Sequence, residues 1–299
     1  MSCLSGLITA SITPFLGENL DESGFRFLLR RQRAAGVDGV VVLGTTGESS
    51  SLTDEEREQV ITIAVEELEG ATPLIVGTGA ASTRETLRQT QQAARLGADY
   101  GLVVTPYYVR PNREGLRRHF LELAHDGGLP LCLYDIPKRC GVALDLELQL
   151  ELLAEPTICA IKSCSGDFAQ WAQLVERLGS RELEATFLLG DDLLALPGMA
   201  LGANGLISVA SNFVPEELVA LIAELSCGQL AAAQLRYRKL LPLLSWLSCE
   251  TNPIPIKAAM ELVGLPSGSP RLPLTSLPID QLATQVDWLR QWVGVSMLP

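Results

Sequence analysis

Several features that mark other classes of protein are missing from this chain of 299 residues. It has only two histidines, His119 and His125, and its seven cysteines form no C-x-x-C pair, so we predict no metal site. No uncharged run reaches the roughly 18 apolar residues that a membrane span needs. The N-terminus has no basic region before an apolar core, as a secretory signal would. Irregularly spaced cysteines are typical of a reducing compartment, and we expect a cytoplasmic protein.

The chain also lacks an excess of positive charge. Its formal net charge is -12 at pH 7, so neither nucleic acid nor an anionic membrane surface is an expected partner, because both bind basic faces. A small anionic substrate is still compatible with this charge, since a few arginines can hold it. The GTTGE stretch at 44–48 lacks the lysine of a P-loop and is a weak nucleotide signal.

Lysine is scarce, with four residues against nineteen arginines. We expect Lys138, Lys239 and Lys257 to keep their ammonium groups in solvent. Lys162 differs because it follows the apolar run TICAI at 157–161, and an ammonium without a partner is costly to bury. In an apolar pocket a lysine loses its proton more readily and becomes a nucleophile. We therefore predict that Lys162 forms a Schiff base, although a lysine at a strand end is more often an exposed cation.

Apolar runs of strand length alternate with helical patterns along the first 210 residues. The runs cover residues 7–13, 39–44, 73–77, 100–105, 131–136, 157–164, 186–191 and 205–210. Short apolar strands joined by helices indicate a parallel sheet buried on both faces, and eight such units match a closed barrel. An open doubly wound sheet is the alternative, but no G-x-G-x-x-G turn follows any of the runs. We predict an α/β fold, a (β/α)8 TIM barrel.

Helical patterns fill the intervals and continue alone after residue 211. They cover residues 23–35, 53–70, 82–96, 113–124, 146–153, 168–178, 193–201, 216–225, 231–247, 255–262 and 279–293. Ser23 is a plausible N-cap of the first, and Thr53 with Glu56 forms a capping-box pattern in the second. We expect a barrel domain over residues 1–228 and a small C-terminal all-helical domain over residues 229–299.

The residues that follow the predicted strands suit one chemistry. A lysine amine attacks a ketone, and a tyrosine bonded to a threonine hydroxyl, such as Tyr134, relays the protons of that reaction. The turn at 44–47 offers hydroxyls and N–H groups to a carboxylate, and Arg139 is placed to hold a second one. Taken singly, Tyr134 is more often a packed aromatic, and we expect a structural role for the acidic pair at 191–192.

Seven stretches in order along nearly the whole chain resemble one family. They are GTTGES at 44–49, GTGA at 77–80, VTPYY at 104–108, LYDIP at 133–137, IK at 161–162, GDD at 190–192 and NPIPIK at 252–257. The chain resembles the dihydrodipicolinate synthase / N-acetylneuraminate lyase family of class I aldolase-like barrels. The resemblance implies a pyruvate Schiff base on Lys162 and no separate cofactor. It also implies that Tyr134 donates and accepts protons.

The same resemblance implies roles for further residues. Thr46 would bind the pyruvate carboxylate, with Ile207 near the same ligand. Thr45 and Tyr108 would complete a proton relay with Tyr134. In the family the residue that matches Tyr108 comes from a neighbouring subunit, which implies at least a dimer and commonly a homotetramer, a dimer of dimers.

Arg139 distinguishes the branches of this family. The synthase branch has an arginine at this place after its Tyr-x-x-Pro motif, and it condenses pyruvate with L-aspartate 4-semialdehyde in the diaminopimelate route to lysine. The alternatives are a related class I pyruvate aldolase or lyase acting on a sugar acid, such as sialic acid or a keto-deoxy acid, and a keto-acid-binding paralogue without catalysis. The sialic-acid lyase branch generally lacks that arginine.

The chain departs from the family pattern at several positions. Asp135 replaces the usual asparagine, and Ser163 and Cys164 replace a Glu-Ala pair. Members inhibited by lysine often carry histidine and asparagine at the effector site. Here the corresponding residues are Asp54, Arg57 and Ala81, while Glu85 and Tyr107 match the family.

Overall fold

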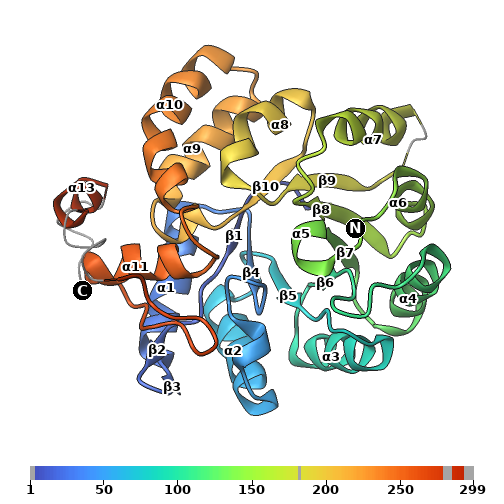
Figure 1. Cartoon of the computed structure of the whole chain (residues 1–299), viewed down its shortest axis with the longest axis horizontal. Helices are drawn as coiled ribbons and strands as arrows, with labels where there is room; N and C mark the ends of the chain where they lie inside the picture. Colours follow the sequence, from blue (N-terminus) through green and yellow to red (C-terminus); the bar gives the residue numbers. More distant parts are fainter. Residues whose placement is uncertain (1–3, 181–182, 279–284, 293–299) are drawn as a thin grey trace.

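The computed structural model describes residues 4–180, 183–278 and 285–292. Eight parallel strands close into a barrel in the order β1-β10-β9-β8-β7-β6-β5-β4, and β4 pairs back onto β1. The strands are β1 (Gly6–Ala10), β4 (Gly39–Val42), β5 (Leu74–Gly77), β6 (Tyr100–Val104), β7 (Leu131–Asp135), β8 (Ile158–Ser163), β9 (Thr186–Leu189) and β10 (Gly205–Ser208). Figure 1 shows them around the centre with helices outside, which confirms the predicted (β/α)8 barrel.

Helices alternate with the strands along the chain. They are α1 (Glu22–Ala35), α2 (Asp54–Leu68), α3 (Thr83–Leu96), α4 (Arg113–Asp126), α6 (Leu146–Leu153), α7 (Phe168–Ser180), α8 (Ala195–Leu201) and α9 (Pro215–Ser226). The predicted capping box of Thr53 and Glu56 is present. The predicted N-cap Ser23 is wrong, because Asp21 occupies that position and accepts the N–H of Gly24 at 2.9 Å. The Ser23 hydroxyl instead donates to the same carboxylate.

Several short elements were not predicted. The strands β2 (Phe15–Leu16) and β3 (Asn19–Leu20) form a hairpin, and α5 (Pro137–Cys140) follows β7. Three 3-10 turns, η1 (Ser49–Ser51), η2 (Asp192–Leu194) and η3 (Ala210–Asn212), follow β4, β9 and β10. Elements of two to four residues are too short to show a hydrophobic period. Three of them, α5, η1 and η2, nevertheless carry residues that line the cavities at the barrel mouth.

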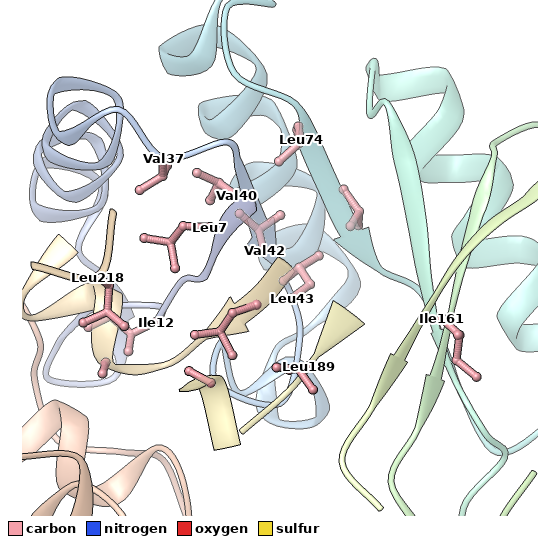
Figure 2. Packing of buried hydrophobic residues seen from close by; sticks show 14 of the residues in the cluster. Leu7, Ile12, Val37, Val40, Val42, Leu43, Leu74, Ile161, Leu189 and Leu218 are labelled. Carbon is pink, nitrogen blue, oxygen red and sulfur yellow. The ribbon is translucent and has the colours of Figure 1, made fainter. Parts of the chain in front are cut away.

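Alternate residues of each strand face two separate cores. On β1, Leu7 belongs to the layer between strands and helices, and Ile8 belongs to the cluster inside the barrel. Figure 2 shows Leu7 with Val40 and Val42 of β4 in the outer layer. This period of two is the reason that one residue in each pair of strand positions points into the barrel. Lys162 is two residues after Ala160 of the inner cluster and shares its face.

The region after β10 contains α9, α10 (Leu230–Trp246), α11 (Ile254–Leu262) and α13 (Val286–Arg290), and the described part of it holds no strand. Leu240 and Leu243 of α10 belong to the same core cluster as the barrel residues, and α10 packs beside α8 and α9 (Figure 1). The division between 1–228 and 229–299 therefore remains a proposal. Of the helix predicted over 279–293, residues 279–284 and 293 lie outside the described residues. No helix among the described residues has the length and apolar character to cross a membrane.

Candidate active site

A cavity of about 340 Å³ lies where the barrel strands end. It is bounded by the segments that follow β4, β7, β8 and β9, and by the end of α10 with the loop after it. Most of the predicted residues line it, namely Thr45, Thr46, Tyr134, Arg139 and Lys162. A second cavity of about 330 Å³ adjoins the first and shares Thr45, Tyr134 and Arg139 with it. The carboxyl ends of barrel strands are where such folds build their reaction centres.

Lys162 and Tyr134 face one another inside this cavity. They are paired residues of the neighbouring strands β8 and β7, so their side chains project to the same face. The Lys162 Nζ lies 4.2 Å from the centroid of the Tyr134 ring. Lys162 is 6% exposed, and no carboxylate among the described residues forms an ion pair with it. Burial lowers the pKa of the Lys162 ammonium, against a smaller opposing effect of Cys164, so the free amine is more accessible.

Gly190 makes room for the lysine. A Cβ at this position would lie 2.6 Å from Cε of Lys162 and 2.3 Å from Sγ of Cys164, which is far inside contact distance. Glycine directly after β9 therefore leaves space for both side chains, and any larger residue would displace them.

The Tyr134 hydroxyl has two polar neighbours. The Thr45 side chain lies close enough to affect its pKa, and the Cys164 thiol donates to it with a sulfur–oxygen distance of 3.9 Å. Burial raises the pKa of Tyr134 well above its usual value, and the neighbouring Thr45 side chain acts in the opposite direction. The tyrosine therefore stays protonated at neutral pH and has a hydroxyl partner to which a proton can pass.

The turn that carries Thr45 and Thr46 has a constrained backbone. Leu43 and Glu48 both have positive φ, 56° and 53°, which side chains other than glycine rarely adopt. The Leu43 carbonyl passes so close to β5 that a Cβ on Gly77 would be 2.1 Å from its oxygen. Thr46 is 2% exposed, and its Oγ1 accepts a hydrogen bond from Nδ2 of Asn252 at 3.0 Å.

The same turn is held by a buried ion pair. Lys257 Nζ lies 2.5 Å from Oε1 of Glu48, and the two side chains are 1% and 2% exposed. The other Glu48 oxygen accepts the N–H of Arg271 at 2.8 Å. The prediction that Lys257 keeps its ammonium in solvent is therefore wrong, because Glu48 compensates the charge inside the protein. Lys138 and Lys239 are exposed as predicted.

Three predicted residues lie at the margin of the site or outside it. Arg139 is exposed at the mouth, and its Nη2 donates to the Asn252 carbonyl at 3.2 Å. Ile207 of β10 belongs to the apolar cluster inside the barrel that includes Tyr134, but it does not line either cavity. Tyr108 is 91% exposed and lies outside both cavities. A single chain thus does not bring Tyr108 to its own site.

The acidic pair after β9 has the structural role that was predicted. Asp191 accepts the N–H of Leu193 at 3.0 Å and so begins η2. Asp192 accepts the Ser208 hydroxyl at 2.5 Å and two main-chain N–H groups after β10 at 3.0 Å each. These bonds join the ends of β9 and β10 beside Lys162.

Nearly the whole sequence matches one family model. The dihydrodipicolinate synthetase family aligns with residues 3–291. The chain belongs to this family. The resemblance seen in the motifs is thereby confirmed.

Relatives in the dihydrodipicolinate synthetase family are similar over nearly their full lengths. A 4-hydroxy-tetrahydrodipicolinate synthase of Methanoculleus marisnigri is 42% identical over 275 residues, which are 91% of this chain and 94% of the relative. The solved dihydrodipicolinate synthase of Aquifex aeolicus is 37% identical, with a TM-score of 0.92 over 97% of this chain and 98% of the other. The Acinetobacter baumannii enzyme, solved in complex with pyruvate, is 36% identical, with a TM-score of 0.92 over 97% and 99%.

Two features of the site were missed at the level of sequence. Lys257 interrupts the apolar stretch IPIKAAM at 254–260, and a lysine in an apolar run is the same pattern that predicts burial of Lys162. Asn252 was part of a family motif but received no role. Its contacts join the turn after β4 to the segment after β7, and no local pattern reports a contact between such distant segments.

Proposed function

We propose that this enzyme is a 4-hydroxy-tetrahydrodipicolinate synthase, which condenses pyruvate with L-aspartate 4-semialdehyde in the diaminopimelate route to lysine. The observation that carries the proposal is the environment of Lys162. Its amine is buried in a cavity, lies against Tyr134 and has no carboxylate partner among the described residues. An amine with a lowered pKa in such a place is suited to attack a ketone.

The first stage joins pyruvate to Lys162. The neutral amine adds to the ketone carbon, and a proton moves from the nitrogen to the former carbonyl oxygen to give a carbinolamine. A second proton, delivered by Tyr134, lets this oxygen leave as water, and an iminium ion remains. Thr45 is a neighbour of Tyr134 and passes the protons onward. No cofactor enters this scheme, since the covalent imine itself acts as the electron sink.

The carboxylate of pyruvate is held by the turn after β4. The buried Thr46 hydroxyl lines the cavity with Lys162 and donates to this anion. Ile207 closes the apolar side of the barrel interior beneath the ligand.

The second stage forms the carbon–carbon bond. The methyl carbon of the iminium loses a proton to the Tyr134 oxygen, which had given up its own proton in the first stage. The resulting enamine attacks the aldehyde carbon of the semialdehyde, whose oxygen takes that proton back from Tyr134. The amino group of the semialdehyde then adds to the iminium carbon and transfers a proton to the Lys162 nitrogen; Lys162 leaves as the free amine, and the cyclic product returns a proton to Tyr134. Arg139 lies at the cavity mouth with one of its five N–H donors used by Asn252. The remaining donors are available to bind the carboxylate of the second substrate.

Tyr108 completes the relay from a second subunit. Its side chain is exposed, as is that of Val109, and neither lines the cavities of its own chain. We propose that Tyr108 enters the site of a neighbouring copy and that the enzyme is a homotetramer, a dimer of dimers, in the cytoplasm.

A related aldolase or lyase acting on a sugar acid is the second candidate, and Cys164 is the observation that favours it. Its thiol lies in the cavity beside Lys162 and Tyr134, at a position where the family pattern has alanine. Condensation assays with aspartate semialdehyde, run beside retro-aldol assays with sialic acid and keto-deoxy sugar acids, separate the two functions. Imine formation without turnover of any of these would indicate a keto-acid-binding paralogue.

The shared chemistry is tested by borohydride reduction in the presence of pyruvate, followed by peptide mass mapping. The adduct should appear on the peptide that contains Lys162 and disappear in the Lys162→Arg variant, which keeps the charge but has no free amine at neutral pH. Lys138→Arg is the matched control and should still be labelled at Lys162. An unlabelled Lys162 at saturating pyruvate would exclude the proposed mechanism.

A further inference from the structure

Asn252 lies between the two parts of the site that bind substrate. It follows α10 and precedes α11, and it lines both cavities at the barrel mouth. Its side-chain Nδ2 donates to Oγ1 of Thr46 at 3.0 Å. Its main-chain oxygen accepts from Nη2 of Arg139 at 3.2 Å. Asn252 is therefore hydrogen-bonded both to Thr46, the proposed binder of pyruvate, and to Arg139, the proposed binder of the semialdehyde.

The bond to Thr46 sets the direction of the threonine hydroxyl. A hydroxyl has one hydrogen to donate and two lone pairs that accept. Because Nδ2 of Asn252 occupies a lone pair of Oγ1, the Thr46 hydrogen must point to some other acceptor. An anionic carboxylate in the cavity is such an acceptor.

The position of Asn252 is fixed by α11. Lys257, five residues further along, forms the buried ion pair with Glu48, which lies two residues after Thr46. The same stretch thus contacts the turn at two points. Within the described part of the chain, Oδ1 of Asn252 is buried and has no hydrogen-bond partner, so the amide is not held by a competing bond on that side.

We propose that Asn252 is a positioning residue that orients the Thr46 hydroxyl as a donor to pyruvate and fixes Arg139 for the second substrate. The inference rests on the proposed function and adds to it the residue that couples the two substrate sites. Asn252→Asp is the sharpest test, because a carboxylate of the same shape would accept the Thr46 hydrogen instead of donating to the oxygen. It would also repel the pyruvate carboxylate.

The experiment measures the pyruvate concentration that half-saturates borohydride trapping, together with steady-state kinetics for both substrates. In Asn252→Asp we expect this concentration and the pyruvate KM to rise about tenfold or more, with kcat changed by less than about threefold. The half-saturating pyruvate concentration of the variant, divided by that of the unmodified enzyme, should decrease as the pH falls, because the new carboxylate becomes protonated. Asn252→Ala should raise the KM of both substrates, since the segment that also holds Arg139 loses its side-chain anchor.

Asn19→Asp and Asn19→Ala are the matched controls, because Asn19 is exposed on β3, away from the cavities. Both should leave trapping and kinetics unchanged. A lower melting temperature in the Asn252 variants with unchanged half-saturation by pyruvate would make the residue structural only and overturn the inference. If the unmodified protein is not trapped by pyruvate at all, the proposed function fails instead, so the two failures are distinguishable.

Discussion

Lys162 and Lys257 are both buried, and their surroundings give them different chemistry. Burial lowers the pKa of each ammonium. Lys257 has the Glu48 carboxylate at 2.5 Å, which opposes the lowering of the Lys257 pKa by burial. Lys162 faces the ring of Tyr134 and an open cavity. A reactive lysine is thus distinguished from a structural one by the absence of a compensating carboxylate, in the part of the chain that the structure describes.

Arg139 is a residue whose effect should be confined to one substrate. Arg139→Ala should raise the KM of the semialdehyde about tenfold to a hundredfold, since a hydrogen bond to a charged group contributes roughly 1.5–3 kcal/mol. Trapping by pyruvate should be unchanged, because Lys162 and Thr46 are retained. Arg118→Ala, at an exposed arginine of α4 that lines neither cavity, is the control. Equal KM values in the variant and the unmodified enzyme would count against this role of Arg139.

Asp135 is a buried carboxyl with an unusual pKa. It is fully buried on β7; Oδ1 accepts the N–H of Leu144 at 3.2 Å, and Oδ2 has no partner among the described residues. Burial raises the pKa of Asp135 from 3.8 to about 6. Between these two values the unfolded chain releases a proton that the folded protein keeps, so this group lowers stability as the pH rises through the window.

Asp135→Asn should therefore stabilise the protein most at neutral pH. The gain in the free energy of unfolding should grow between about pH 4 and pH 7 and reach at most about 3 kcal/mol. Urea unfolding at several pH values measures it, with the exposed Asp126→Asn as the control. A gain of the same size at every pH would show that ionisation of Asp135 is not its cause.

Among the helices, α11 holds the turn after β4 in place through the ion pair of Lys257 with Glu48. Lys257→Met would leave the Glu48 carboxylate buried without its cation, and the free energy of unfolding should fall by about 3–5 kcal/mol. Glu48→Gln combined with Lys257→Met should recover part of this loss, because no charge then remains in the interior. Lys239→Met breaks an exposed pair with Glu217 and should cost less than about 1 kcal/mol. Urea midpoints compare the variants, and equal losses for Lys257→Met and Lys239→Met would contradict the argument.

The strands and most helices could be predicted from the sequence because each is long enough to show its own period. The run at 7–13 was nevertheless longer than β1, since Ile12 is buried but its N–H is bonded to Asn212 rather than to a strand. The strands β2 and β3 have two residues each, which is too few to show a hydrophobic period. The Phe15 ring is packed under Lys257 and Arg271, each with its charged group 4.2 Å from the ring centroid. That packing depends on residues from the far end of the chain.

At the scale of the whole molecule, the exposed Tyr108 predicts active-site complementation between subunits. Tyr108→Ala and Lys162→Ala should each be nearly inactive when prepared alone. In a hybrid dimer one site contains both an intact Lys162 and an intact Tyr108 from its partner. Random mixing in a two-fold symmetric pair should then restore about a quarter of the unmodified activity.

The complementation is measured by the condensation assay after the two variants are dissociated together and reassociated. A mixture of Lys162→Ala and Lys162→Arg is the control and should stay inactive, because no site in it has the lysine. Activity no greater than the sum of the separate variants would mean that each chain uses its own Tyr108.

Patterns within short segments of the sequence are enough to predict the barrel and the family, and they mark Lys162 as a candidate nucleophile. The tertiary structure decided which of two lysines in apolar runs is free to react, and which residue connects the substrate sites. Glu48 and Lys257 are 209 residues apart in the chain, and Thr46 and Asn252 are 206 apart. Whether a buried charge is compensated, and where a hydroxyl hydrogen points, depend on neighbours that only the closing of the barrel and the packing of α11 bring together.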